Sequence, residues 1–298
     1  MTVRAAAGSP SAIAADAPGP RGFVDLHSHS TASDGALAPA AVVETAARAG
    51  LVALALTDHD TLAGIAEARE AGERLGVRIV PGVELSLMDG DREVHMLGLH
   101  IATVDALQAE LEAVRDSRKS RAEQIVAKLN ALGVPVTIEA VFAEAAGGAV
   151  GRPHIARAII AGGWVRDQRE AFDRYLGGGR PANVEKQRIS MADGIRLIHD
   201  CGGLAVTAHP GGDGRRERVE PWIALGLDGL EVRHPGHSSE DMLRIEALVE
   251  FFGLVKSGGS DWHGATSGPR VLGGMHVPAE WLEQQDALVE KRRAAAVA

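Results

Sequence analysis

Residues 24–29 read Val-Asp-Leu-His-Ser-His and follow a tail rich in Ala, Pro, Gly and Ser. In an extended strand side chains alternate between faces, so Asp25, His27 and His29 share one face of this stretch. Two imidazoles on one strand face can bind the same cation, although an isolated His-x-His also occurs as two surface histidines. The stretch therefore predicts a first strand that carries a pair of metal ligands.

Helical segments and short apolar runs alternate after this strand, as in parallel βα units, which predicts an α/β fold. The unbroken apolar run 51–56 suits a strand buried on both faces. Further strands are expected at 77–80, 93–99, 204–207, 229–232 and 254–256. Helices are expected at 39–49, 62–75, 190–200, 217–225 and 238–252.

The alternation is interrupted between residues 103 and 188. One long amphipathic helix is expected over 103–132, followed by short helical pieces between 138 and 176 and a glycine-rich exit at 177–179. The sequence therefore predicts a helical insertion subdomain, 103–188, within a discontinuous main domain. That main domain comprises 21–102 and 189–298, and residues 1–20 are expected to form a disordered tail.

Composition narrows the partners and the compartment. The chain has 298 residues, a net charge of -9 and 45% hydrophobic residues, so a long nucleic-acid duplex or an anionic membrane is a poor general partner. A single cysteine, Cys201, excludes an intramolecular disulfide framework and a thiolate-rich zinc site. No apolar run reaches the roughly 18 residues of a membrane span. We expect a globular cytoplasmic protein, and the sequence leaves its oligomeric state open.

His, Asp and Glu side chains recur at or just beyond the C-terminal ends of the predicted strands, which form the functional rim of α/β barrels. The nine candidate ligands are His27, His29, Asp34, His59, Glu84, His95, His209, Asp261 and His263. Imidazoles and carboxylates without a thiolate suit Mn, Fe or Zn, with Mg at the positions richest in carboxylates. The number of candidates implies more than one metal ion.

The ordered set of motifs resembles the polymerase and histidinol phosphatase (PHP) metallophosphoesterases over about residues 21–275. The motifs are Asp25-Leu26-His27-Ser28-His29-Ser30, Ser33-Asp34-Gly35, Thr57-Asp58-His59-Asp60, Gly82-Val83-Glu84, Ala208-His209-Pro210 and Gly258-Gly259-Ser260-Asp261-Trp262-His263-Gly264. The resemblance implies a distorted (β/α)7-type barrel with two or three divalent metal ions, Mn foremost.

The resemblance also implies a role for each ligand. His27, His29, Glu84 and Asp261 would hold the first metal, and Glu84 would bridge to a second held by His95 and His209. Asp34, His59 and His263 would hold the third. The implied reaction is in-line hydrolysis of a phosphate monoester or terminal diester by a metal-bound hydroxide, with Glu84, His209 and Asp261 around it. Asp25 and Asp58 are expected to orient imidazoles.

Two further segments resemble the branch that acts on nucleotide 3',5'-bisphosphates, some members of which trim the 5' ends of short RNAs. They are Gly151-Arg152-Pro153-His154 and Val184-Glu185-Lys186. Arg152, His154 and Lys186 could grip a second phosphate or could belong to a solvated helix face. His237 is a further candidate for substrate contact.

One departure from the branch concerns a phosphate-binding Arg expected soon after Ala-His-Pro. The chain instead reads Gly211-Gly212-Asp213-Gly214-Arg215-Arg216, so either Arg215 or Arg216 reaches back or the contact is lost.

Three alternatives stay open at this point. A histidinol-phosphate phosphatase would use the same metals on a smaller substrate. A deaminase or amidase of the amidohydrolase type usually needs a lysine at a strand end, which neither Lys186 nor Lys256 provides. A non-catalytic structural or protein-binding module would be expected to lose ligands, whereas this chain retains the whole set.

Overall fold

The computed structural model describes residues 22–145, 150–184 and 189–297. Its strands fall into two sheets, with the orders β10-β1-β2-β3 and β6-β4-β5-β7-β8-β9. The strands are β1 (Phe23–Asp25), β2 (Leu51–Leu56), β3 (Arg78–Pro81), β4 (Val83–Asp89), β5 (Arg92–Leu99), β6 (Ile189–Ser190), β7 (Leu204–Thr207), β8 (Gly229–Arg233), β9 (Val255–Gly258) and β10 (Val277–Pro278).

Backbone hydrogen bonds join the two sheets to each other at two places. Beyond β1, the Leu26 amide donates to Gly258 on β9 over 3.0 Å, and beyond β2 the Asp60 amide donates to Glu84 on β4, also over 3.0 Å. The strands β1, β2, β4, β5, β7, β8 and β9 therefore form a ring, with the core inside it and under the helices. The predicted α/β class with a (β/α)7-type barrel is confirmed.

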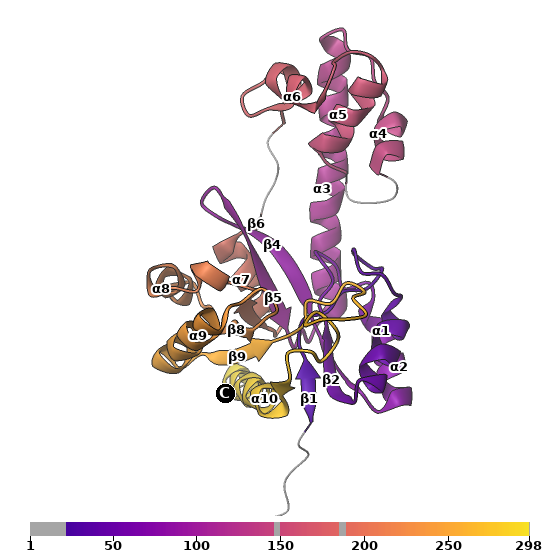
Figure 1. The fold of residues 1–298 in the computed structure, drawn as a ribbon. Coiled ribbons are helices and arrows are strands. Elements are labelled where there is room, and N and C mark those ends of the chain that lie inside the picture. The colour runs from indigo at the N-terminus through magenta and orange to yellow at the C-terminus, as the bar shows by residue number, and fades with distance from the viewer. Residues whose placement is uncertain (1–21, 146–149, 185–188, 298) are drawn as a thin grey trace, which may run out of the picture.

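Six helices pack around the outside of the sheets (Figure 1). They are α1 (Pro39–Arg48), α2 (Ile65–Leu75), α7 (Met191–Asp200), α8 (Arg216–Ala224), α9 (Ser239–Phe252) and α10 (Ala279–Val297). Ser238 caps α9 by accepting a hydrogen bond from the Asp241 amide, and Gly253 ends it with a φ of 67°, a conformation that favours glycine. None of the helices in the described ranges is long and apolar enough to cross a membrane.

Two regions differ from the sequence-based expectation. Residues 83–89 form a strand, β4, which the sequence analysis did not predict. Only Gly82 separates β4 from β3, so in the sequence the two strands look like one short apolar run. β4 pairs antiparallel with β5, which in turn pairs antiparallel with β7. The chain also ends in α10, which no expectation covered, and its Trp281 and Val289 are buried against the barrel.

The insertion stands on α3 (Val104–Ala131) and includes α4 (Ile138–Ala145), α5 (Arg152–Ala161), α6 (Gln168–Ala171) and the π-helical turn η1 (Phe172–Leu176). Leu107 near the start of α3 packs in the barrel core, whereas Ile125 and Leu129 near its end belong to a second apolar cluster within the insertion. The division into domains stays a prediction, which these two separate clusters support. Residues 1–20 lie outside the described part.

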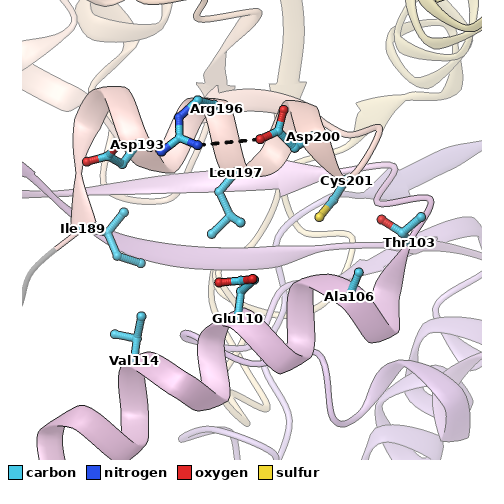
Figure 2. Close-up of a pocket in the computed structure, with 10 residues that line it drawn as sticks. All are labelled: Thr103, Ala106, Glu110, Val114, Ile189, Asp193, Arg196, Leu197, Asp200 and Cys201. Carbon is cyan, nitrogen blue, oxygen red and sulfur yellow. Dashed lines mark hydrogen bonds and ion pairs between the residues drawn. The ribbon is translucent and has the colours of Figure 1, made fainter.

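A cavity of about 460 Å³ lies between α3 and α7 (Figure 2). Glu110 and Val114 line it from α3, and Leu197 and Cys201 line it from the α7 side. Of the side chains that the structure describes on α3, Leu107 and Leu111 near its start pack in the barrel core, and the later part of the helix carries the insertion away from the barrel (Figure 1).

Candidate metal centre

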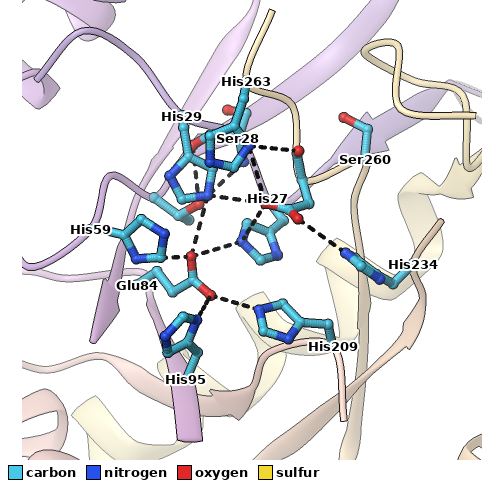
Figure 3. A network of polar contacts seen from close by, with 12 residues as sticks. His27, Ser28, His29, His59, Glu84, His95, His209, His234, Ser260 and His263 are labelled. Carbon is cyan, nitrogen blue, oxygen red and sulfur yellow. Dashed lines mark hydrogen bonds and ion pairs between the residues drawn. The ribbon is translucent and has the colours of Figure 1, made fainter. Parts of the chain in front are cut away.

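The two carboxylate oxygens of Glu84 face two separate groups of imidazoles (Figure 3). Its Oε2 lies 3.2–3.3 Å from one ring nitrogen each of His27, His29 and His59. Its Oε1 lies 3.0 Å from His95 Nδ1 and 2.9 Å from His209 Nε2. Glu84 is 1% exposed, so this carboxylate stands between the two groups inside the barrel.

Asp261 and Asp34 extend the cluster toward solvent. Asp261 Oδ1 lies 3.3 Å from His29 Nε2 and 3.5 Å from His263 Nδ1. Asp34 Oδ1 lies 3.3 Å from His263 Nε2 and 3.7 Å from His29 Nδ1. All nine predicted ligands therefore meet at one end of the barrel, although their assignment to particular metals stays a proposal.

The backbone explains how segments far apart in sequence reach one rim. His209 lies two residues beyond β7 and Asp261 three residues beyond β9, with φ values of 30° and 50°, a strained conformation for non-glycine residues that is common at functional sites. Gly259 is required because a Cβ there would lie 2.5 Å from the backbone nitrogen of His27. The Gly-Gly-Ser-Asp segment thus allows β9 to run close enough to β1 for Asp261 to meet the histidines.

The expectation that every ligand lies at or just beyond the C-terminal end of a strand is wrong for His95, and Glu84, three residues beyond β3, lies at the same time inside the next strand. Glu84 is the second residue of β4, and His95 is the fourth residue of β5. Because β5 runs antiparallel to its neighbours, its first half lies at the rim where the parallel strands end. His95 thereby faces Glu84 from inside a strand.

Buried ring nitrogens without hydrogen bonds test whether these residues fit a metal. Among the described residues, both ring nitrogens of His29 and Nδ1 of His95 are buried and make no hydrogen bond of good geometry, although carboxylate oxygens lie 3.0–3.7 Å away. Buried polar atoms rarely stay unpaired, and neutral imidazole nitrogens beside carboxylates are the ligands that borderline cations prefer. Three groups, each with ligand atoms within 4.8 Å of one another, could hold an ion: His29, Asp34, His59, His263; His27, His29, Glu84, Asp261; and His59, Glu84, His95. The donor set fits divalent metal.

The protonation of Glu84 suits this role. Burial raises the pKa of Glu84, but the charge of His27 and the hydrogen bonds from His209 and His27 outweigh burial and hold the pKa well below its ordinary value. The carboxylate therefore stays ionised at neutral pH, as cation binding requires.

Two further residues hold the ligands in place and were not predicted. Glu231, fully buried on β8, accepts a hydrogen bond from His27 Nδ1 over 3.0 Å and another from the His209 amide over 2.5 Å. His234 Nδ1 accepts from the Gly236 amide, so its Nε2–H donates to Asp261 Oδ2 over 3.3 Å. Such contacts fix the tautomer and orientation of metal ligands. The signal in the sequence was a glutamate inside an otherwise apolar strand.

Glu231→Gln is expected to weaken metal binding by about 10- to 100-fold, the usual cost of losing such a partner. The amide keeps the shape of the side chain but loses its negative charge. That charge keeps Nδ1 of His27 protonated and so leaves Nε2 of the same ring directed toward Glu84. Calorimetric titration with Mn²⁺ measures the affinity, with the exposed Glu217→Gln on α8 as the control. An affinity within twofold of the wild type would contradict this role.

Asp25 and Asp58 do not orient imidazoles, contrary to the expectation. Asp25 accepts hydrogen bonds from the backbone amides of His27, Ser260 and Gly273. Asp58 accepts from the Ser30 amide over 2.7 Å, and from the hydroxyls of Ser30 and Ser33. Both carboxylates fasten the loops that carry the ligands, because those loop amides have no strand partner.

The predicted substrate contacts are only partly described. Arg152 Nη1 donates to the Leu176 carbonyl and to Asn183 Oδ1, and His154 Nδ1 accepts from the Gly151 amide at the start of α5. Lys186 lies outside the described residues. In the described part of the chain, the side chains of Arg152 and His154 therefore form hydrogen bonds within the insertion. Their role in substrate binding stays a proposal.

His237 and the two arginines after Ala-His-Pro also have defined positions. His237 Nδ1 donates to the Val232 carbonyl, and its Nε2 accepts from the Gly211 amide, so both ring nitrogens are engaged. Arg216 pairs with Glu220, while Arg215 is exposed in front of α8. Arg216 therefore does not reach back to the metal centre.

Comparison with known proteins identifies the family. The family model described as "PHP domain" matches residues 25–175. A 3',5'-nucleoside bisphosphate phosphatase of Chromobacterium violaceum is 39% identical over 84% of this chain and 90% of its own length. The chain belongs to the PHP family. The 5'-3' exoribonuclease Rnm of Escherichia coli is 36% identical over 80% of this chain and 84% of its own length.

A solved structure agrees with the PHP assignment. A Bifidobacterium adolescentis protein assigned as a metal-dependent phosphoesterase superposes with a TM-score of 0.63 at 32% identity, over 90% of this chain and 96% of its own. This PHP protein is therefore a metal-dependent phosphoesterase, a hydrolase, with a His, Asp and Glu cluster able to bind metal.

Proposed function

We propose that this PHP protein removes the 3'-phosphate of nucleotide 3',5'-bisphosphates, with two or three divalent ions, Mn foremost. The observation that carries the proposal is that the two carboxylate oxygens of Glu84 face two separate groups of imidazoles. This is the arrangement expected of a carboxylate that bridges two cations. The relative in Chromobacterium violaceum that bears this activity supports the choice of substrate.

In the proposed assignment His27, His29, Glu84 and Asp261 hold one cation, and Glu84, His95 and His209 hold a second. Asp34, His59 and His263 hold a third. Bound cations would activate water and neutralise the phosphoryl oxygens. Glu231 and His234 keep the ligands oriented, and Glu84 stays ionised between the two imidazole groups.

The exposure of the ligands indicates the side from which the phosphate arrives. The side chains of His59, His95, His209 and His263 are 27–35% exposed, whereas those of His27, His29 and Glu84 are at most 1% exposed. The buried ligands form the floor of the site, and the exposed ones form its edge. Among the described residues, this gradient of exposure points to the open rim as the side from which a phosphate ester reaches the cluster.

The insertion supports a substrate with a second phosphate. α3 starts at the end of β5 that lies away from the metal centre, and its 28 residues span roughly 42 Å, longer than the barrel strands. The helix therefore passes the rim and carries α5, with Arg152 and His154, beyond the side from which substrate enters (Figure 1). We propose that Arg152, His154 and Lys186 meet the second phosphate and that His237 positions the loop after β7.

The assay uses Mn-loaded protein and follows phosphate release from adenosine 3',5'-bisphosphate and histidinol phosphate, and shortening of a 5'-phosphorylated RNA. The expected result is fastest release from the bisphosphate and loss of activity in EDTA, restored by Mn²⁺. Hydrolysis of the RNA at a comparable rate would favour the second candidate function, a 5'-3' exoribonuclease like the Escherichia coli relative. No hydrolysis of any of these compounds would contradict the proposal.

A further inference from the structure

A guanidinium lies against the outer edge of the metal cluster. Arg270 Nη1 is 2.7 Å from Asp261 Oδ2, and the Arg270 side chain is 47% exposed. We propose that Arg270 is a catalytic residue that binds the phosphoryl group during its transfer, an inference that rests on the proposed hydrolysis of a phosphate ester.

The carboxylate of Asp261 lies between the cluster and Arg270, with one oxygen facing each of them. Oδ1 faces inward, 3.3–3.5 Å from ring nitrogens of His27, His29 and His263, and Oδ2 faces Arg270. A cation bound at Oδ1 would draw the carboxylate charge inward. Only the carboxylate of Asp261 would then separate Arg270 from that cation. A phosphoryl group bound to the cation would have an oxygen within reach of the guanidinium.

Arg270 has donors to spare for that oxygen. In the described part of the chain its hydrogen bonds go to Asp261 alone and use Nη1 alone. Nε and Nη2 are left to form the parallel pair of hydrogen bonds with which arginine binds phosphate. The loop that carries Arg270 contains Gly268 and Gly273 with φ values of 80° and 76°, and Asp25 fastens it through the Gly273 amide.

The loop after β7, where an arginine was expected to meet phosphate, contains Asp213, Arg215 and Arg216. Asp213 pairs with Arg92 and Arg218, and Arg215 is exposed in front of α8. Arg216 pairs with Glu220 and lies 5.2 Å from the centroid of the Phe251 ring. Arg216 is thus engaged away from the metal centre, whereas Arg270, from the loop after β9, places its guanidinium against the cluster.

The step assigned to Arg270 involves no proton exchange. The bond from phosphorus to the ester oxygen breaks, a bond to the oxygen of water forms, and the protons of that water end on the leaving alcohol and on phosphate. Arg270 remains charged throughout and stabilises the negative charge on the phosphoryl oxygens as the bond breaks.

The test compares Arg270→Gln and Arg270→Lys with the wild type, and uses Arg216→Gln as a matched control. Metal content, calorimetric affinity of the Mn-loaded protein for inorganic phosphate, and kcat/KM are measured for each. We expect unchanged metal content, clearly weaker phosphate binding and a fall in kcat/KM of about 10²- to 10³-fold in Arg270→Gln. Arg270→Lys should recover part of the loss, and Arg216→Gln should behave as the wild type.

Substrate choice and chemical rescue separate this role from others. The loss should be equal for adenosine 3',5'-bisphosphate and 3'-AMP, because both present the same scissile group, and guanidine should restore activity to Arg270→Ala. Loss of metal together with unchanged phosphate affinity per metal-loaded site would overturn the inference, since Arg270 would then only position Asp261. A loss confined to the bisphosphate would also overturn it. Phosphate calorimetry tests Arg270 even if the wild type hydrolyses none of these esters.

Discussion

Glu84→Gln is expected to lose bound metal and to lower kcat/KM by about 10³-fold or more, because several kcal/mol of charge stabilisation by the cations would go with it. The carboxylate is shared between two imidazole groups, so one substitution removes charge from two metal positions. An amide also brings two N–H donors toward ring nitrogens whose lone pairs would have to bind a cation. The effect should therefore exceed that of removing any ligand at the edge, such as Asp34.

Metal content by elemental analysis and phosphate release by the same preparation measure both consequences. Glu73→Gln, an exposed change of the same kind on α2, is the matched control and should leave both quantities unaltered. Full metal occupancy in Glu84→Gln would contradict the bridging role, whatever the activity.

Asp25→Ala is expected to lower the free energy of unfolding by about 3–5 kcal/mol, because it leaves three backbone amides without their acceptor in a buried place. Those amides belong to His27, Ser260 and Gly273, and Asp25 itself is 1% exposed. In a chain of 298 residues the loss corresponds to a fall in Tm of about 5–8 °C.

Thermal unfolding in EDTA measures the loss of stability separately from any change in metal affinity. Asp200→Ala is the control, since Asp200 is exposed and has one ion pair of 3.9 Å with Arg196, which contributes little. If the two variants unfold at the same temperature, Asp25 does not have the role assigned to it.

The sequence predicts the gathering of the ligands well, because His27, His209 and Asp261 lie at or beyond the ends of apolar runs that alternate with helical segments, the pattern of parallel strands in βα units. Their partners are harder to predict. Glu231 belongs to no motif, and it meets His27 only because the ring places β8 between β7 and β9. Asp25 shares a strand face with His27 by periodicity, yet its side chain bonds the backbone beside β9.

The hairpin of β4 and β5 illustrates the same limit. Periodicity within 93–99 identifies a strand but carries no information about its direction. The direction decides whether the first half of the strand, which contains His95, lies at the rim or at the opposite end of the barrel. Pairing between segments far apart in sequence is a property of the assembled sheet, so it could not be read from either segment alone.

The contact between β1 and β9 bears on how the enzyme is made. β1 leaves the ribosome first among the strands, and its partner β9 comes more than two hundred residues later, with Asp261 and His263 directly behind it. Until then the sheet has an open edge and the metal centre lacks two of its proposed ligands. The complete set of proposed ligands therefore exists only after residue 263 has been synthesised, and a bound cation would tie the segment after β1 to the segment after β9, as a cross-link does in proteins that have disulfides.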